Sequence, residues 1–408
     1  MIISQASHSA DTDSVRFAAQ IRSDADRNRT REAFIRIHRK IAAPETVGDP
    51  FLAAGLLPAM LLGESLQIEA PVSDRLVQSV KTVQDIFACW YPGYLRRIEV
   101  ITPQVIAEGA PRTSEATACF FSGGMDSRYS MLKHRETISA LITVKGFDLP
   151  TDNQTIWPRL ATVNRETAAE FGMDFIAVES NLREALDPTY PAGDFWGKCL
   201  HGPLLAAVGL CFQREFGTMI IPSTWPYHRL VPWGSHPLVD VEWSTAAIRF
   251  VHDGCEHGRL DKLRVLAKTP NALRGLRTCF DCTAGSFNCE RCDKCVRTKL
   301  MLDLFGVFEA AGSYGQPMPL EDLVTWEIAD FRRMIYQDLV REAAARGHTE
   351  MVHHLQIALG ERHSFRRDWH RFKRCSIATG SWIVAKLGLP RQVCSVRKRW
   401  KRIKDLWA

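Results

Sequence analysis

The chain has 408 residues, of which 46% are hydrophobic and 24% are charged. These are ordinary values for globular proteins, so they exclude a disordered or fibrous chain, and the length suits two or three domains. The longest nearly uncharged apolar stretch, residues 51–63, is too short to cross a bilayer. Because the first residues lack the basic region and the apolar run of a secretion signal, we expect a cytoplasmic protein with free thiols.

The formal net charge of +6 is unevenly distributed. Residues 361–408 carry fourteen Lys and Arg against three Asp and Glu, whereas the rest of the chain carries 38 basic and 43 acidic residues. Aromatic residues such as Trp369 and Trp400 are interleaved with the tail's cations, a pattern that suits contact with RNA. A membrane surface and packing of the tail over the protein's own acidic surface are the open alternatives.

In the first 112 residues, hydrophobic spacing predicts an α+β arrangement. Residues 1–45 are polar, and their apolar positions, among them Phe17 and Ile21, fit a helical pattern. The elements expected next are an apolar helix at 51–62, a strand at 66–68, a helix from Asp74 through Trp90 and a strand near 97–101. A Gly-Ala-Pro-Arg linker at residues 109–112 marks an expected domain boundary.

After this linker, buried strands alternate with helices. Strands are expected at 116–121, 138–144, 174–178 and 218–222. Three helices are expected between them: one that ends near His134, one at 155–171 and one at 202–215. This alternation predicts an α/β fold with a doubly wound parallel sheet and helices on both faces. The expected divisions of the chain are an N-terminal α+β domain (1–112), a nucleotide-binding domain (113–275), a cysteine-rich knuckle (276–300), a helical region (301–360) and the basic tail (361–408).

The most informative segment is Ser122-Gly123-Gly124-Met125-Asp126-Ser127, between the first buried strand of this region and its helix. Successive amide N–H groups and the positive end of the helix dipole form an anion site there, to which serine hydroxyls can add donors. Neither the GxxxxGK[ST] loop nor the GxGxxG fingerprint is present. A plain strand-to-helix turn is the structural alternative.

These six residues resemble the SGGxDS signature of the PP-loop ATP pyrophosphatases, a superfamily with a Rossmann-like (HUP) fold. It includes 7-cyano-7-deazaguanine synthase, some tRNA-thiolating enzymes and the asparagine, NAD and GMP synthetases. The resemblance implies ATP binding by Ser122, Gly123, Gly124, Asp126 and Ser127, with Asp126 and Ser127 catalytic and Asp126 helping to hold Mg²⁺. Arg128 and Tyr129 depart from the Ser or Thr that is common after the signature.

Five cysteines fall within seventeen residues, from Cys279 to Cys295. The spacing Cys289-x2-Cys292-x2-Cys295 is typical of metal ligands, and an upstream cysteine can complete a tetrahedron. Cys279 followed by CxxCxxC resembles the zinc site of 7-cyano-7-deazaguanine synthase, so we expect structural Zn²⁺ on Cys279, Cys289, Cys292 and Cys295. Cys282 is a spare or competing ligand, and a reactive or iron–sulfur role is the rival interpretation.

Further candidates follow the other strands. Asp148 comes after the second strand, where it can face a ligand beyond the strand ends or cap a turn. The long loop after the fourth strand predicts a substrate wall, with Ser223, Thr224, His236 and Asp240 as substrate-side candidates. Lys145, Lys198 and Arg229 are the cations considered for the α-phosphate.

The motifs SGGxDS, GFDLPTDN, GSHPLVD and NCERCDKCVRT also occur in this order in a group of uncharacterised bacterial PP-loop proteins, a resemblance that covers about residues 50–300. We expect an ATP-dependent ligase that forms AMP and pyrophosphate, adenylates a carboxylate, amide or carbonyl oxygen and transfers it to a nitrogen nucleophile. No cysteine follows Met1, so we expect no glutaminase domain of the type that uses an N-terminal cysteine as nucleophile. The nitrogen would then come from ammonia, an amine or a separate protein. Sulfur insertion, on tRNA or a small molecule, and a non-catalytic nucleotide-sensing or RNA-binding protein are the alternatives. Whether the chain forms a homodimer is open.

Overall fold

The computed structural model describes residues 1–26, 29–107, 114–191, 193–279 and 285–362. The expected linker at 109–112, the cysteine at position 282 and nearly all of the basic tail therefore lie outside the described residues. The chain divides into two compact units, one from Met1 to Pro317 and one beginning at Met318. Among the described helices, none combines the length and the apolar character that a membrane span requires.

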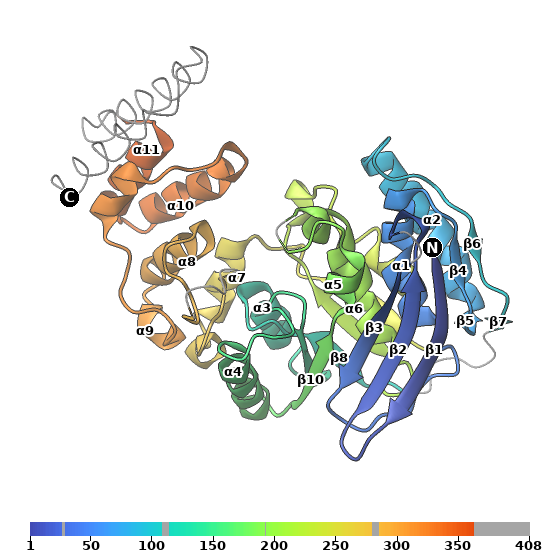
Figure 1. Cartoon of the computed structure of the whole chain (residues 1–408). Helices are drawn as coiled ribbons and strands as arrows, with labels where there is room; N and C mark the ends of the chain where they lie inside the picture. Colours follow the sequence, from blue (N-terminus) through green and yellow to red (C-terminus); the bar gives the residue numbers. More distant parts are fainter. Residues whose placement is uncertain (27–28, 108–113, 192, 280–284, 363–408) are drawn as a thin grey trace, which may run out of the picture. The chain divides into compact units, whose positions relative to one another are not determined.

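A ten-stranded, mostly parallel sheet organises the first unit, in the order β12-β11-β8-β9-β10-β3-β2-β1-β4-β6 (Figure 1). Its strands are β1 (Ile2–Ala10), β2 (Val15–Arg22), β3 (Thr30–Ile37), β4 (Leu66–Ile68), β6 (Val100–Ile101), β8 (Thr117–Phe120), β9 (Ile138–Lys145), β10 (Asp174–Ser180), β11 (Thr218–Pro222) and β12 (Arg249–Asp253). Two further strands, β5 (Val72–Ser73) and β7 (Val105–Ile106), pair with each other. The expected α/β class is therefore confirmed.

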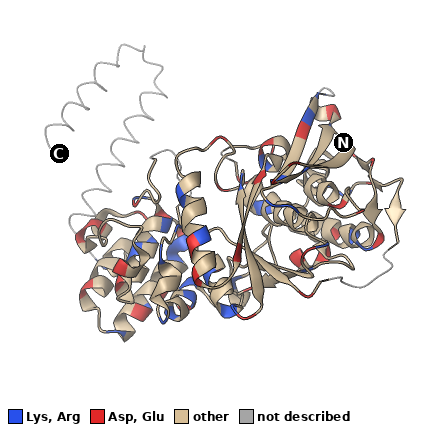
Figure 2. Cartoon of the chain, turned by 90° about the horizontal axis from the view of Figure 1, so that it is seen from below, with Lys and Arg blue, Asp and Glu red and all other residues tan. Residues whose placement is uncertain are grey.

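Helices of the first unit cover both faces of the parallel strands, with α3 and α4 on one side and α1 and α6 on the other (Figure 1). They are α1 (Asp49–Leu62), α2 (Asp74–Trp90), α3 (Met125–Lys133), α4 (Trp157–Glu170), α5 (Leu182–Leu186), α6 (His201–Leu210), α7 (Arg259–Leu266), α8 (Asp293–Leu304) and α9 (Phe308–Ala311). The second unit contains α10 (Arg333–Ala345) and α11 (Thr349–Leu359). Figure 2 shows charged residues of both signs scattered over the described helices.

The helical pattern expected for residues 1–45 is wrong. These residues form β1, β2 and β3. In β2, the buried residues Val15, Phe17, Ala19 and Ile21 alternate with half-buried or exposed ones, and the second half of β3 has the same pattern. β3 pairs antiparallel with β10, so the strands from both sides of residue 112 form one sheet. Their apolar side chains also belong to one continuous core, which includes most residues of the helices α1 and α6.

The parallel half of the sheet has its topological switch point at β8. From β8 the chain moves outward to β9 and then β10 on one side, and later fills the other side with β11 and β12. The strand at β12 was not expected from the sequence. In open α/β sheets, ligands bind beyond the carboxyl ends of the strands where the strand order reverses. The glycine loop follows β8 and therefore occupies this position.

Candidate functional site

The glycine loop leaves β8 and turns sharply into α3. Gly123 has a φ of +75°, in the left-handed region, and Gly124 takes an extended conformation as the N-cap of α3. The N–H of Gly124 donates to Ser122 Oγ at 3.3 Å, and Ser127 Oγ donates to the Gly124 carbonyl at 3.0 Å. Ser122 is exposed and Gly124 half-buried, so the start of the helix is open to a ligand. This is the geometry of an anion site.

A fully buried arginine, Arg128, holds the glycine loop through hydrogen bonds to backbone carbonyls. Arg128 Nε donates to the Gly123 carbonyl at 2.9 Å, and Arg128 Nη1 donates to the Ala272 carbonyl at 2.8 Å. The backbone N–H of Arg277 donates to the same Gly123 carbonyl at 3.0 Å. Burial lowers the pKa of Arg128 to about 9. Arg128, which departs from the signature's usual pattern, therefore has a structural role: it connects the glycine loop to Ala272.

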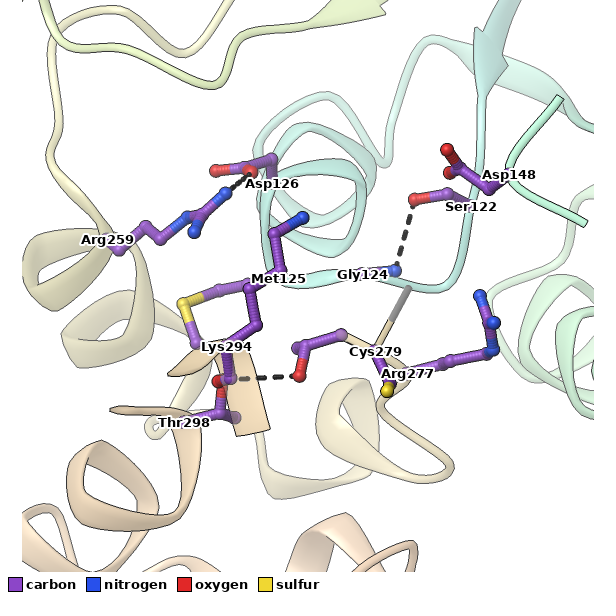
Figure 3. Close-up of a pocket in the computed structure, with 11 residues that line it drawn as sticks. Ser122, Gly124, Met125, Asp126, Asp148, Arg259, Arg277, Cys279, Lys294 and Thr298 are labelled. Atoms are coloured by element: carbon purple, nitrogen blue, oxygen red, sulfur yellow. Dashed lines mark hydrogen bonds and ion pairs between the residues drawn. The ribbon is translucent and has the colours of Figure 1, made fainter. Parts of the chain in front are cut away.

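Asp126 lies in the first turn of α3 and is engaged by two cations from α7. Lys262 Nζ is 2.9 Å from its Oδ1, and Arg259 Nη2 is 3.2 Å from its Oδ2 (Figure 3 shows the arginine pair). Lys262 is almost completely buried and also donates to the Ser223 carbonyl at 2.6 Å. Burial alone would raise the pKa of Asp126, but the two cations outweigh it and lower the pKa.

The loop opens into a cavity, shown with its lining residues in Figure 3. The described residues that line it are Ser122, Gly124, Met125, Asp126, Asp148, Arg259, Arg277, Thr278, Cys279, Lys294 and Thr298. Three cations and two carboxylates thus face the same space. Lys294, from the first turn of α8, is half-buried, and burial together with Arg259 lowers its pKa to about 7, against the effect of the two carboxylates. A cavity with backbone donors, two arginines and a lysine suits a phosphate-bearing ligand.

Beside this cavity, four thiols are gathered within 4.8 Å of one another: Cys279, Cys289, Cys292 and Cys295. The Sγ atoms of Cys279 and Cys292 are 3.8 Å apart, and those of Cys289 and Cys295 are 3.9 Å apart. Zinc–sulfur bonds of about 2.3 Å in a tetrahedron require sulfur separations of about 3.8 Å. The four cysteines expected from the sequence therefore fit one structural metal ion such as Zn²⁺, with no ligand position left open.

The structure brings only some of the substrate-side candidates to the cavity. Asp148 lines it, whereas Ser223 is fully buried and donates its hydroxyl to the Trp225 carbonyl at 2.8 Å. Thr224 is half-buried on the same loop and is not among the lining residues. His236 is buried edge-on against Trp90 of α2.

Asp240 belongs to a separate buried polar cluster. It is fully buried and accepts hydrogen bonds from Ser235 Oγ at 2.7 Å and from the backbone N–H of His236 at 3.3 Å, and its Oδ2 lies 2.7 Å from His252 Nδ1. Burial would lower the pKa of His252, but the hydrogen bonds to Asp240 and Cys255 raise it to about 9. This pair ties the loop after β11 to β12 and was not expected from the sequence.

Cations considered from the sequence lie elsewhere. Lys145 is buried and its Nζ is 3.7 Å from Glu179 Oε1, and Lys198 pairs with Asp194 four residues before it. Arg229 is half-buried on the loop after β11. The cations near the cavity are instead Arg259, Lys262, Arg277 and Lys294, which sequence reasoning missed.

Comparisons of the chain with protein-family models, with curated proteins and with solved structures found no match. Functional assignment therefore depends on the geometry and chemistry of the cavity.

Proposed function

We propose that the cavity binds ATP with Mg²⁺ and that the protein is an AMP- and pyrophosphate-forming enzyme. The observation that carries the proposal is the glycine loop at the switch point of the parallel sheet, opening into a cavity rich in cations. Backbone N–H groups at a helix N-terminus and surrounding arginines and lysines are the groups that bind phosphates in proteins.

In this proposal the diphosphate of ATP lies on residues 122–127, with Arg259 and Arg277 beside it. Both guanidiniums line the cavity, where they can donate two parallel hydrogen bonds to phosphate oxygens. Asp126 and Asp148 supply carboxylate oxygens of the kind that Mg²⁺ prefers, and both also line the cavity. When bound, Mg²⁺ would neutralise charge on the phosphates.

The proposed reaction has two steps. An oxygen of the acceptor attacks the α-phosphorus, the bond between that phosphorus and the bridging oxygen breaks, and pyrophosphate leaves with the electron pair. A nitrogen nucleophile then attacks the adenylated carbon and displaces AMP, which gives an amide or a related bond. Preorganised N–H groups and cations at the leaving diphosphate would stabilise the charge that develops there. This assigns the protein to the amide-forming ligases.

The test is ATP turnover with Mg²⁺ against pooled small metabolites and an RNA fraction, with separation of AMP, ADP and pyrophosphate. Asp126→Asn removes the carboxylate of the loop, and Asp261→Asn is the matched control, because Asp261 is a half-buried acid of α7 that pairs with Arg264 and does not line the cavity. We expect AMP and pyrophosphate from one pool, lost in Asp126→Asn and retained in Asp261→Asn. Production of ADP and phosphate would overturn the proposal.

A further inference from the structure

The described residues of the cysteine knuckle, 276–279 and 285–300, contribute to a wall of the candidate nucleotide cavity and to the candidate metal site. Arg277, Thr278 and Cys279 are consecutive lining residues, and the thiol of Cys279 is one of the four gathered sulfurs. Thr298 of α8 also lines the cavity. Its Oγ1 lies 3.3 Å from Thr278 Oγ1 and donates to the Lys294 carbonyl at 2.7 Å. The metal ligands and two of the lining cations, Arg277 and Lys294, are therefore parts of one small substructure.

Lys294 is the lining cation that lies next to the metal ligands in the sequence. It stands between Cys292 and Cys295, at the start of α8, and its side chain lines the cavity. Cys292 is the N-cap of α8, and its thiol is one of the four gathered sulfurs, as is that of Cys295 in the first turn. A metal ion bound to Cys292 and Cys295 would hold this first turn, and with it Lys294.

We propose that the metal-loaded knuckle places Lys294, together with Arg277, to bind the phosphates of the nucleotide, so that metal binding and nucleotide binding are coupled. This inference rests on the proposed function. The knuckle metal then has a role beyond stabilising the fold, because the residue between two of its ligands contacts the nucleotide. Coupling of this kind is reciprocal: the factor by which the metal strengthens nucleotide binding equals the factor by which the nucleotide strengthens metal binding.

The first experiment measures binding of ATP with Mg²⁺ to the full zinc-loaded chain by titration calorimetry, with no acceptor present. Lys294→Met removes the ammonium and keeps most of the side-chain length. Arg291→Met is the matched control, because Arg291 is an exposed cation of the same knuckle that is not among the lining residues. Zinc content and far-UV circular dichroism of both variants are compared with those of the unmodified chain.

We expect the Kd for ATP to rise roughly 10- to 100-fold in Lys294→Met, the range for loss of a hydrogen bond to a charged group. The Kd should change less than about threefold in Arg291→Met, because an exposed charge acts through screened, long-range attraction only. Equal Kd values for the two variants, with full zinc content, would overturn the inference while leaving the proposed function intact. Absence of ATP binding by the unmodified chain would overturn both.

The second experiment measures coupling without relying on the metal-free chain staying folded. The rate at which zinc passes from the protein to a coloured chelator is followed with and without ATP and Mg²⁺. We expect ATP to slow zinc transfer about tenfold or more in the unmodified chain and in Arg291→Met, but not in Lys294→Met. An equal zinc-transfer rate with and without ATP in a chain that binds ATP would overturn the coupling.

Discussion

Gly123→Ala tests whether the glycine loop is held in the shape that the anion site requires. A Cβ at this position would lie 2.7 Å from Asn164 Oδ1, well inside the ordinary contact range of 3.4–4 Å. Asn164 is fully buried, and its Nδ2 donates to Thr143 Oγ1 at 3.0 Å. It cannot move away from the new methyl group without weakening that hydrogen bond.

The expected cost has two parts. A positive φ costs a residue with a side chain about 1–2 kcal/mol, and displacement of buried Asn164 adds about 1–3 kcal/mol for a weakened buried hydrogen bond. Gly172→Ala isolates the first part, because Gly172 has a φ of +71° and nothing lies within 4 Å of its added Cβ.

Urea unfolding followed by tryptophan fluorescence measures both variants. We expect Gly123→Ala to lose about 1–3 kcal/mol more of the free energy of unfolding than Gly172→Ala, and to bind ATP more weakly. If the two substitutions cost the same, Asn164 does not constrain the loop, and the explanation given for Gly123 is incorrect.

Three further predictions concern the regions around the cavity. The His252–Asp240 pair should contribute about 3 kcal/mol of stability. The pKa of His252 in the folded protein, about 9, exceeds the ordinary 6.5, so this contribution is complete below about pH 6.5 and is lost as the pH rises through 9. The free energy of unfolding in urea should therefore differ less between pH 6 and pH 9 in Asp240→Asn than in the unmodified chain. Asn288→Ala should lower the free energy of unfolding by about 3 kcal/mol, because buried Asn288 accepts from the N–H groups of residues 278 and 279 and donates to two carbonyls. The same substitution should speed the transfer of zinc to a chelator, because these hydrogen bonds hold the backbone next to Cys279. Cys282→Ser should leave one zinc per chain by elemental analysis, because four other thiols already lie at zinc-ligand separation; loss of the metal would show that Cys282 is a ligand.

Most of the parallel strands could be predicted because they are short, largely apolar runs. β4 and β11 have the expected bounds, and β9 differs by one residue. β12 was missed because its sequence, Arg-Phe-Val-His-Asp, carries three polar residues at the edge of the sheet. In the N-terminal strands the signal was present as alternation with a period of two, but spacing between a few large residues was interpreted as helical.

In the candidate site, likewise, the residues that are adjacent in the sequence could be predicted, and those that only the fold brings together could not. Six consecutive residues form the glycine loop, so the motif alone indicates its position. The cations come from α7, α8 and residue 277, more than 130 residues further along the chain than Asp126, and only the fold brings them to the loop. Ser223 and Asp240 follow the expected strand, yet their side chains turn inward, because buried backbone and side-chain groups there need hydrogen-bond partners.

Asp126 illustrates why product analysis is needed to establish the function. Its carboxylate neutralises Lys262, whose buried ammonium otherwise has only the Ser223 carbonyl among its described hydrogen-bond partners. Replacing one partner of such a pair leaves an uncompensated charge and destabilises the local structure, whatever the carboxylate does for a metal. Loss of turnover in Asp126→Asn would therefore follow from either role. The identity of the nucleotide product depends on which phosphorus is attacked, so AMP with pyrophosphate separates adenylation from γ-phosphate chemistry even where the substitution does not.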